Sequence, residues 1–137
     1  MSFESDWQKV EQHIGSIMSQ AVRATLFQVS TGIIKGTPVD TGRAKNNWFV
    51  SVGSPEYRTT ESVDSTRQGS MSGEKIAEVN ESVSVAVGDI FYITNNLHYI
   101  YRLEFEGWSD QAPAGWVRKN VQQFNKLLES NIRAAAQ

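Results

Sequence analysis

The N-terminal part of the chain carries a long amphipathic pattern, which constrains the fold more than any other feature. Within residues 3–34, apolar side chains recur at alternating gaps of four and three: Phe3, Trp7, Val10, Ile14, Ile17, Ala21 and Ala24. A second row then continues beside the first: Val22, Leu26, Val29 and Ile33. The pattern predicts one helix of roughly 45 Å, because each residue adds about 1.5 Å. Such a helix is long for a small domain, so we expect part of it to project or to pack on a neighbour.

Both ends of this helix carry sequence signals. Ser2 is a suitable N-cap, and Glu4 and Asp6 lie where the helix dipole favours negative charge. Gly36 weakens the far end, and Pro38 prevents continuation. We therefore expect the helix to end shortly before Pro38.

The middle of the chain predicts strands separated by a long polar segment. Residues 47–53 indicate a strand, and residues 55–73 contain almost no apolar side chain, so we expect a flexible loop or arm there. A weak signal favours a short helix at 74–80. Alternating valines at 83–87 predict a half-buried strand, and the F-Y-I-T run at 91–94 predicts the next strand of a hairpin.

The C-terminal part adds a second helical region. Residues 99–105 fit either a strand or a short helix, and residues 107–115 form a loop. A last helix is expected from about 116 to 133, with a buried face made of Val117, Val121, Phe124, Leu128 and Ile132. The order predicts a single α+β domain over residues 1–137, in which a long N-terminal helix and a C-terminal helix pack with a small, mainly antiparallel sheet.

Composition excludes several classes of function. The 137 residues include no cysteine, which excludes disulfides, thiolate metal sites and cysteine nucleophiles. The net charge of -2 disfavours a protein whose main task is to grip nucleic-acid phosphates. We expect a soluble protein without a signal peptide or membrane span, because no run approaches the roughly 20 apolar residues that a spanning helix needs.

The stretch T-P-V-D-T-G-R at 37–43 raises one catalytic hypothesis. Asp-Thr-Gly carries the catalytic carboxylate of aspartic proteases, and a short chain with one copy could form a homodimeric protease around Asp40. Its flanks argue against this, because K-G-T-P-V breaks a helix instead of completing an apolar strand. A turn explains the same residues: Asp40 caps it and Gly42 allows a left-handed conformation. We favour the turn.

Other catalytic patterns are weaker still. His13 and His98 are isolated from any further metal ligand, and the common nucleotide-binding and nucleophile motifs do not occur. Glu104 and Glu106 would share a face if they lay on a strand, but an exposed face or ion pairs with Arg102 and Arg118 explains them more simply. The sequence predicts no catalytic site, no cofactor and no metal.

Large aromatic residues indicate an interaction surface instead. Trp108 lies among small and polar residues in a loop, so it either anchors an interface or folds back on its own sheet. The other candidate interface residues are Trp116, Arg118 and Lys119.

Three motif blocks together resemble the HK97 gp10-like family of phage tail-component (neck or tail-completion) proteins. The first is the turn, the second is I-T-N-N-L-H-Y-I-Y-R-L-E-F-E-G at 93–107, and the third is A-P-A-G-W-V-R at 112–118. The matching positions are Pro38, Asp40, Thr41, Gly42, Arg43, Asn95, Tyr99, Leu103, Glu104, Phe105, Gly107 and Pro113. The chain departs from the family pattern at His98, where the family usually has proline, and at Glu106, which separates Phe105 from Gly107.

The resemblance implies a non-enzymatic virion protein at the head–tail junction of a long-tailed phage, made in the host cytoplasm. Proteins of this family form a ring, usually sixfold, through which DNA passes without sequence-specific binding. The expected partners are copies of the chain, the head-closure or connector ring, and the tail-terminator or tail-tube protein. A prophage remnant with no present role, or the protease, are the alternatives. In the ring, the arm at 55–73 is expected to become ordered on assembly.

Overall fold

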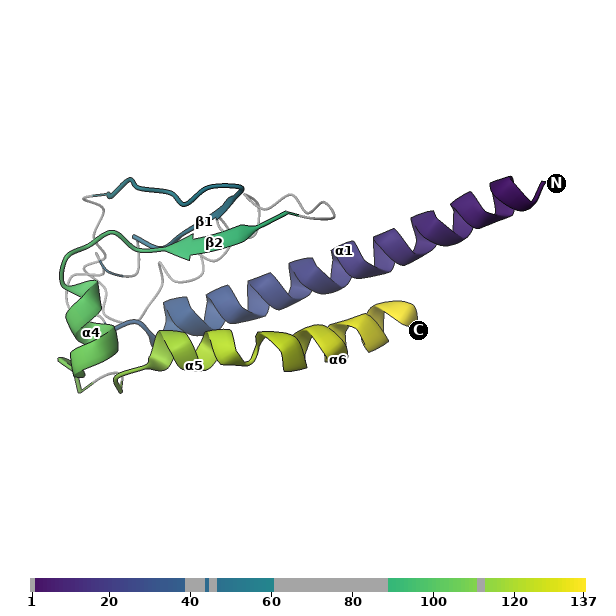
Figure 1. Ribbon diagram of the computed structural model, residues 1–137. Coiled ribbons are helices and arrows are strands. Elements are labelled where there is room, and N and C mark those ends of the chain that lie inside the picture. Colours follow the sequence, from purple (N-terminus) through teal and green to yellow (C-terminus); the bar gives the residue numbers. More distant parts are fainter. Residues whose placement is uncertain (1, 39–43, 45–46, 61–88, 111–112) are drawn as a thin grey trace.

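The computed structural model describes residues 2–38, 44, 47–60, 89–110 and 113–137. The elements are α1 (Phe3–Gly36), β1 (Phe49–Val52), β2 (Phe91–Thr94), α4 (Ile100–Glu106), α5 (Trp116–Gln122) and α6 (Phe124–Ala136). In Figure 1, α1 runs through the middle of the molecule, with the strands on one side and α5 and α6 on the other. This arrangement confirms the predicted α+β class with a long N-terminal helix.

Helix α1 begins and ends close to the predicted positions. The Ser2 Oγ accepts a hydrogen bond from the Ser5 amide at 3.1 Å, which confirms the predicted N-cap. The helix continues to Gly36, and Thr37 then has an extended backbone with ψ 128°, as a residue before proline favours. The Thr37 Oγ1 donates to the Ile33 carbonyl at 2.7 Å and so pairs one acceptor near the helix end.

The sheet of the described residues contains two antiparallel strands. Phe49 lies opposite Thr94, and Val52 lies opposite Phe91. The predicted strands at 47–53 and 91–94 are therefore confirmed, although the first is shorter than predicted. The predicted strand at 83–87, and with it the hairpin to β2, lies outside the described residues.

Residues 99–105, for which the sequence allowed a strand or a helix, contribute to helix α4. The helix ends at Gly107, whose φ of 62° is left-handed, a conformation that glycine adopts without a Cβ clash. Leu103 and Glu104 are its buried residues. Glu104 and Glu106 therefore do not share a strand face.

The predicted helix at 116–133 is two helices, α5 and α6, separated at Gln123. Both helices pack mainly against α1. The Asn131 side chain of α6 donates a hydrogen bond to the Thr25 Oγ1 of α1 at 3.0 Å. The face predicted to be buried is half-buried at Val117, Phe124, Leu128 and Ile132. Val121 of the same face is 48% exposed and lines an open groove.

The core lies around the C-terminal half of α1, and β2 and α6 add partly buried side chains around it. Its buried cluster consists of Val29, Ile33, Ile34, Trp48, Val50, Leu103 and Trp116. The indole N–H groups of the two core tryptophans both find an acceptor near the end of α1. Trp48 donates to the Thr37 Oγ1 at 2.9 Å, and Trp116 donates to the Ile33 carbonyl at 3.1 Å. The helix end, the sheet and α5 are thus fixed to one another.

Most of the predicted arm at 55–73 and the whole of the predicted helix at 74–80 lie outside the described residues. The first part of the arm, residues 55–60, is described and follows β1 without regular secondary structure. Among the helices of the described part of the chain, none is long and apolar enough to cross a membrane.

Candidate interaction surfaces

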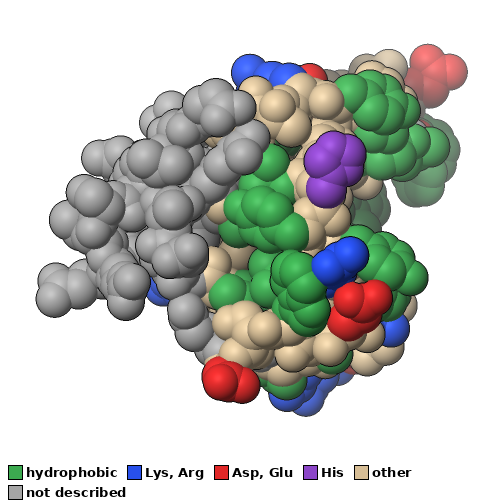
Figure 2. Space-filling model, turned by 90° about the vertical axis from the view of Figure 1, so that its left-hand side faces the viewer, with side chains coloured by type: hydrophobic (Ala, Val, Ile, Leu, Met, Phe, Trp, Pro, Cys, Tyr) green, Lys and Arg blue, Asp and Glu red, His purple; other side chains and the backbone are tan. Residues whose placement is uncertain are grey.

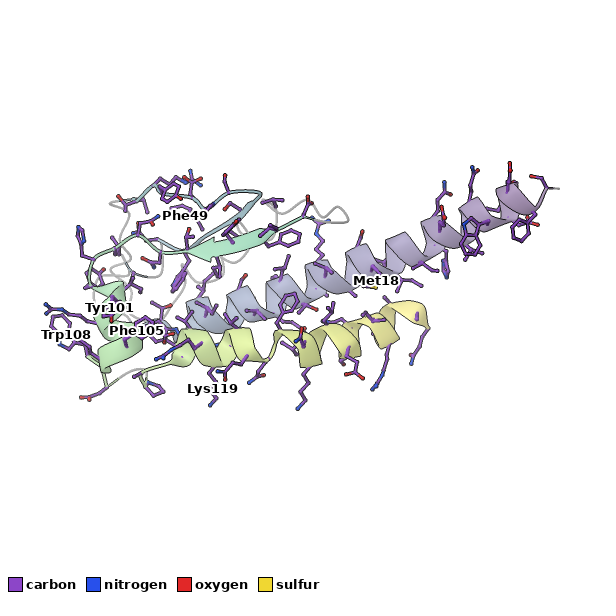
Figure 3. The ribbon with its side chains drawn as sticks, in the orientation of Figure 1. Met18, Phe49, Tyr101, Phe105, Trp108 and Lys119 are labelled. Carbon is purple, nitrogen blue, oxygen red and sulfur yellow. The ribbon has the colours of Figure 1, made fainter. Side chains whose placement is uncertain are left out.

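The N-terminal half of α1 exposes a row of large apolar side chains, which we call the N-terminal row. Its members are Phe3 (82% exposed), Trp7 (55%), Val10 (46%), Ile14 (54%) and Met18 (37%). The first turns of α1 extend past the end of α6, and Figure 3 marks Met18 where the two helices still run together. A contiguous apolar surface of this kind is uncommon on a monomer and marks an interaction site.

The N-terminal row is flanked by acidic side chains. Glu4, Asp6 and Glu11 lie on the same helical segment, against the single cation Lys9. Their positions close to the row mean that a partner surface which covers the row also approaches these carboxylates. A partner of positive charge is therefore favoured.

A second apolar surface is a partly open groove of about 380 Å³ where α1, the sheet and the C-terminal helices meet. Leu26 of α1, Phe91 of β2 and Phe124 of α6 contribute to its walls. At its mouth, Ile90 is 61% exposed and Val121 is 48% exposed. We call this surface the apolar groove.

A third surface, the aromatic end, lies at α4, far from the N-terminus. The rings of Tyr101 and Phe105 stack at 4.6 Å, and the guanidinium groups of Arg102 and Arg118 lie over the rings of Trp108 and Phe105 at 4.5 and 4.4 Å. Figure 3 shows the side chains of Tyr101, Phe105 and Trp108 close together, and Figure 2, which looks onto this end, shows hydrophobic side chains beside charged ones.

The aromatic end answers the question that the sequence left open for Trp108. Its side chain is 60% exposed and contacts Arg102, so it does not fold back into the core. Tryptophan, tyrosine and arginine are the residues enriched at the centres of binding interfaces. The fold-back of Trp108 on its own sheet is therefore excluded, and its role as an interface anchor stays a prediction.

Glu104 of the second motif block holds the third block in place. Its carboxylate accepts hydrogen bonds from the backbone amides of Val117 at 3.1 Å and Arg118 at 2.9 Å, and forms an ion pair with Arg118 at 3.5 Å. The Glu104 carbonyl also accepts the amide of Gly115 at 2.6 Å. Glu104 therefore caps α5 from another helix, supplying acceptors for amides that a helix start leaves unpaired.

Asn95 of the same motif block contacts the chain near the end of α1. Its side-chain amide donates to the Ala44 carbonyl at 2.9 Å, and its side-chain oxygen accepts the Leu97 amide at 3.2 Å. The neighbouring Asn96 donates to the carbonyls of Glu56 and Arg58, which fixes the described start of the arm to the loop after β2.

Asn47 joins two segments through its side chain in a similar way, and this role was not predicted from the sequence. It is fully buried, accepts the Thr60 amide at 2.8 Å and donates to the Thr60 carbonyl at 3.0 Å. The only sequence signal was a recurring Asn-Asn pair, at 46–47 and 95–96. A buried asparagine can satisfy a backbone amide and carbonyl at once, because it carries both a donor and an acceptor.

The remaining predicted site residues separate into buried and exposed groups. Trp116 is 5% exposed and belongs to the core, so its ring is not on the surface of this chain. Leu103 is also a core residue, whereas Lys119 and Pro113 are exposed. Tyr99 packs half-buried against the core.

The first motif block is described only at its edge. Pro38 is buried directly after the end of α1. Asp40, Thr41, Gly42 and Arg43 lie outside the described residues, and so does the predicted capping of the turn.

The two glutamates of the second block form ion pairs. Besides the Glu104–Arg118 pair, Glu106 lies 4.0 Å from Arg102, which agrees with the predicted pairing. His13 and His98 are exposed. Within the described ranges, no group of three or more histidine or acidic side chains is arranged to hold a metal ion.

Comparison of the chain with protein-family models, with curated proteins and with solved structures finds no match.

Proposed function

We propose that this chain is a non-enzymatic structural protein of a long-tailed phage virion, which assembles into a ring at the head–tail junction. The observation that carries the proposal is the N-terminal row, a set of large apolar side chains on a projecting helix that its own domain leaves exposed. A chain with such a surface is built for association with neighbours. The motif resemblance supplies the location of that assembly.

The contacts of the motif residues support a structural role over a catalytic one. Glu104 caps α5, Asn95 holds the Ala44 carbonyl and Leu103 packs in the core. Each of these residues joins segments that are distant along the chain. These contacts give the three motif residues a role in holding the fold together, which supports a structural function for the motif.

In this proposal the ring has closed cyclic symmetry, sixfold by the family resemblance. It contacts the head-closure or connector ring on one side and the tail-terminator or tail-tube protein on the other. Genome DNA passes through without sequence-specific contacts, and a chain with net charge -2 suits that passage because a strongly basic channel would retain DNA.

The test is electron microscopy of a lysate from a phage whose gene for this chain carries a stop codon at Trp48. We expect DNA-filled heads separate from tails, and joining on addition of the purified protein. Intact joined particles would contradict the assignment to the junction. Immature, unprocessed heads would instead support the protease hypothesis for Asp40.

A further inference from the structure

We propose that the N-terminal row of one copy docks into the apolar groove of the next copy, so that each subunit contributes a helix on one side and a groove on the other. The inference rests on the proposed function, because it names the surfaces through which the ring closes. It follows from two apolar surfaces of the same chain that the fold leaves open.

The spacing of the row suits a groove. Phe3, Trp7, Val10 and Ile14 follow one another at gaps of four, three and four residues, so they lie on one face of α1. Amphipathic helices that dock into hydrophobic grooves use anchors at this spacing. The groove offers apolar walls from three directions: α1, the sheet and the C-terminal helices.

A chain cannot fill its own groove with its own row. Leu26 and Val29, which line the groove, lie on the same continuous helix as Trp7. At about 1.5 Å per residue, Trp7 is separated from Leu26 by roughly 28 Å along the helix axis. The row that enters the groove must therefore come from a second copy.

Charge favours the same pairing. The segment 3–18 carries three carboxylates against one cation. One wall of the groove belongs to α5 and α6, which carry Arg118, Lys119, Lys126 and Arg133. Arg118 and Arg133 already form ion pairs with Glu104 and Glu129, so the positive charge that these helices offer to a partner comes from the exposed Lys119 and Lys126. These lysines lie on the helices beside the groove, whereas the charged residue that lines the groove itself is Asp89. Pairing two rows with each other would instead bring acidic segments together, which electrostatic complementarity disfavours.

The apolar area of the N-terminal row also favours a concave receptor. Phe3 and Trp7 each retain more than half of their exposure, and large aromatic side chains contribute about 150–250 Å² each when buried. With the three aliphatic members, the row supplies a few hundred Å² on one subunit. A stable interface needs about 800 Å² per partner, so the row requires a concave receptor that also covers its flanks.

Because the row and the groove are different surfaces, the contact is heterologous. Heterologous contacts build rings when the rotation between subunits closes. One such contact, repeated around the ring, is therefore enough to build it without a second kind of interface, provided that the rotation between subunits closes.

Complementation between two defective variants tests this inference by sedimentation of the purified full chain. Trp7→Glu disables the row, and Val121→Asp disables the groove; both positions are exposed, so the fold should persist, as circular dichroism checks. We expect each variant alone to remain monomeric, with a dissociation constant raised by roughly 30-fold or more, as for a central tryptophan anchor. Mixed in equal amounts, the two variants should form a dimer and nothing larger, because one intact row meets one intact groove.

Gln8→Glu and Gln122→Asp are the matched controls, since they add the same charges at neighbouring exposed positions and should assemble like the wild type. If Val121→Asp assembles normally, the groove is not the receptor, while the ring itself would stand. If the mixture stays monomeric, or the wild type never associates, the docking is wrong. The role at the head–tail junction is judged separately by the stop-codon phage, so the two failures are distinguishable.

Discussion

The two halves of α1 have the same kind of amphipathic pattern but opposite surroundings. In the C-terminal half, Val29, Ile33 and Ile34 are buried by the sheet, α5 and α6. In the N-terminal half, Trp7 and Ile14 remain more than half exposed, and the first turns of α1 extend past the end of α6. The comparison shows that an apolar row on a helix specifies a contact without saying whether the contact comes from the same chain. The following variants test how far the two halves differ.

The largest contrast is expected from removing the same side-chain atoms in each half. Ile33→Ala removes a fully buried side chain and leaves a cavity, so the free energy of unfolding should fall by about 2–5 kcal/mol. Ile14→Ala, at a 54% exposed position, should change it by about 0.5 kcal/mol or less while the chain is monomeric. Urea unfolding of both variants gives the two values. Equal losses would show that the N-terminal half is already packed in the monomer.

The second-largest effect is expected at α5, which covers the buried C-terminal half of α1. Glu104→Ala leaves the Val117 and Arg118 amides without their acceptor, and α5 should detach more easily from α1. We expect a loss of about 1–3 kcal/mol in unfolding free energy, because two partly buried donors lose their charged acceptor. Glu106→Ala is the matched control: its pair with Arg102 is half exposed at both ends and contributes little. A control as destabilised as Glu104→Ala would refute the capping role.

Glycine substitutions give a smaller contrast of opposite sign. A Cβ at Gly36 would lie 2.9 Å from the buried Trp116 ring, so Gly36→Ala should destabilise the chain by about 1–2 kcal/mol. A Cβ at Gly15 meets nothing within 4 Å, so Gly15→Ala should raise helicity and favour α1 by up to about 1 kcal/mol. Thermal unfolding followed by circular dichroism measures both. A destabilising Gly15→Ala would mean that the free half packs against something.

The smallest effect is expected directly after α1. Asp40→Asn should cost about 1 kcal/mol or less, because asparagine forms caps and turns nearly as well as aspartate. Phage carrying this substitution should still join heads to tails. A protease would lose essentially all activity, so unprocessed heads in this mutant would overturn the structural interpretation of the D-T-G motif.

The sequence was sufficient for features that depend on local pattern. The row from Phe3 onward and the signals at Ser2 and Pro38 located α1, and the F-Y-I-T run located β2. Features that depend on distant contacts were missed. The capping of α5 by Glu104 joins residues separated by a loop, and the burial of Trp116 depends on the end of α1.

The same limit explains the errors in the C-terminal region. Periodicity predicted that Val121 would be buried, but whether a helix face is covered depends on what lies opposite, and here that is the open groove. The exposed position of Trp108 could not be decided either, since both alternatives used the same loop sequence.

Hydrogen exchange of α1 at increasing protein concentration tests the central claim most directly. The account predicts that amides in residues 21–34 exchange slowly at every concentration, because their half of the helix is held by its own domain. Amides in residues 3–18 should exchange rapidly in the monomer and become protected only as the ring assembles. Fast exchange of residues 3–18 in the assembled ring would contradict the account, because the row would then remain uncovered where it is proposed to dock.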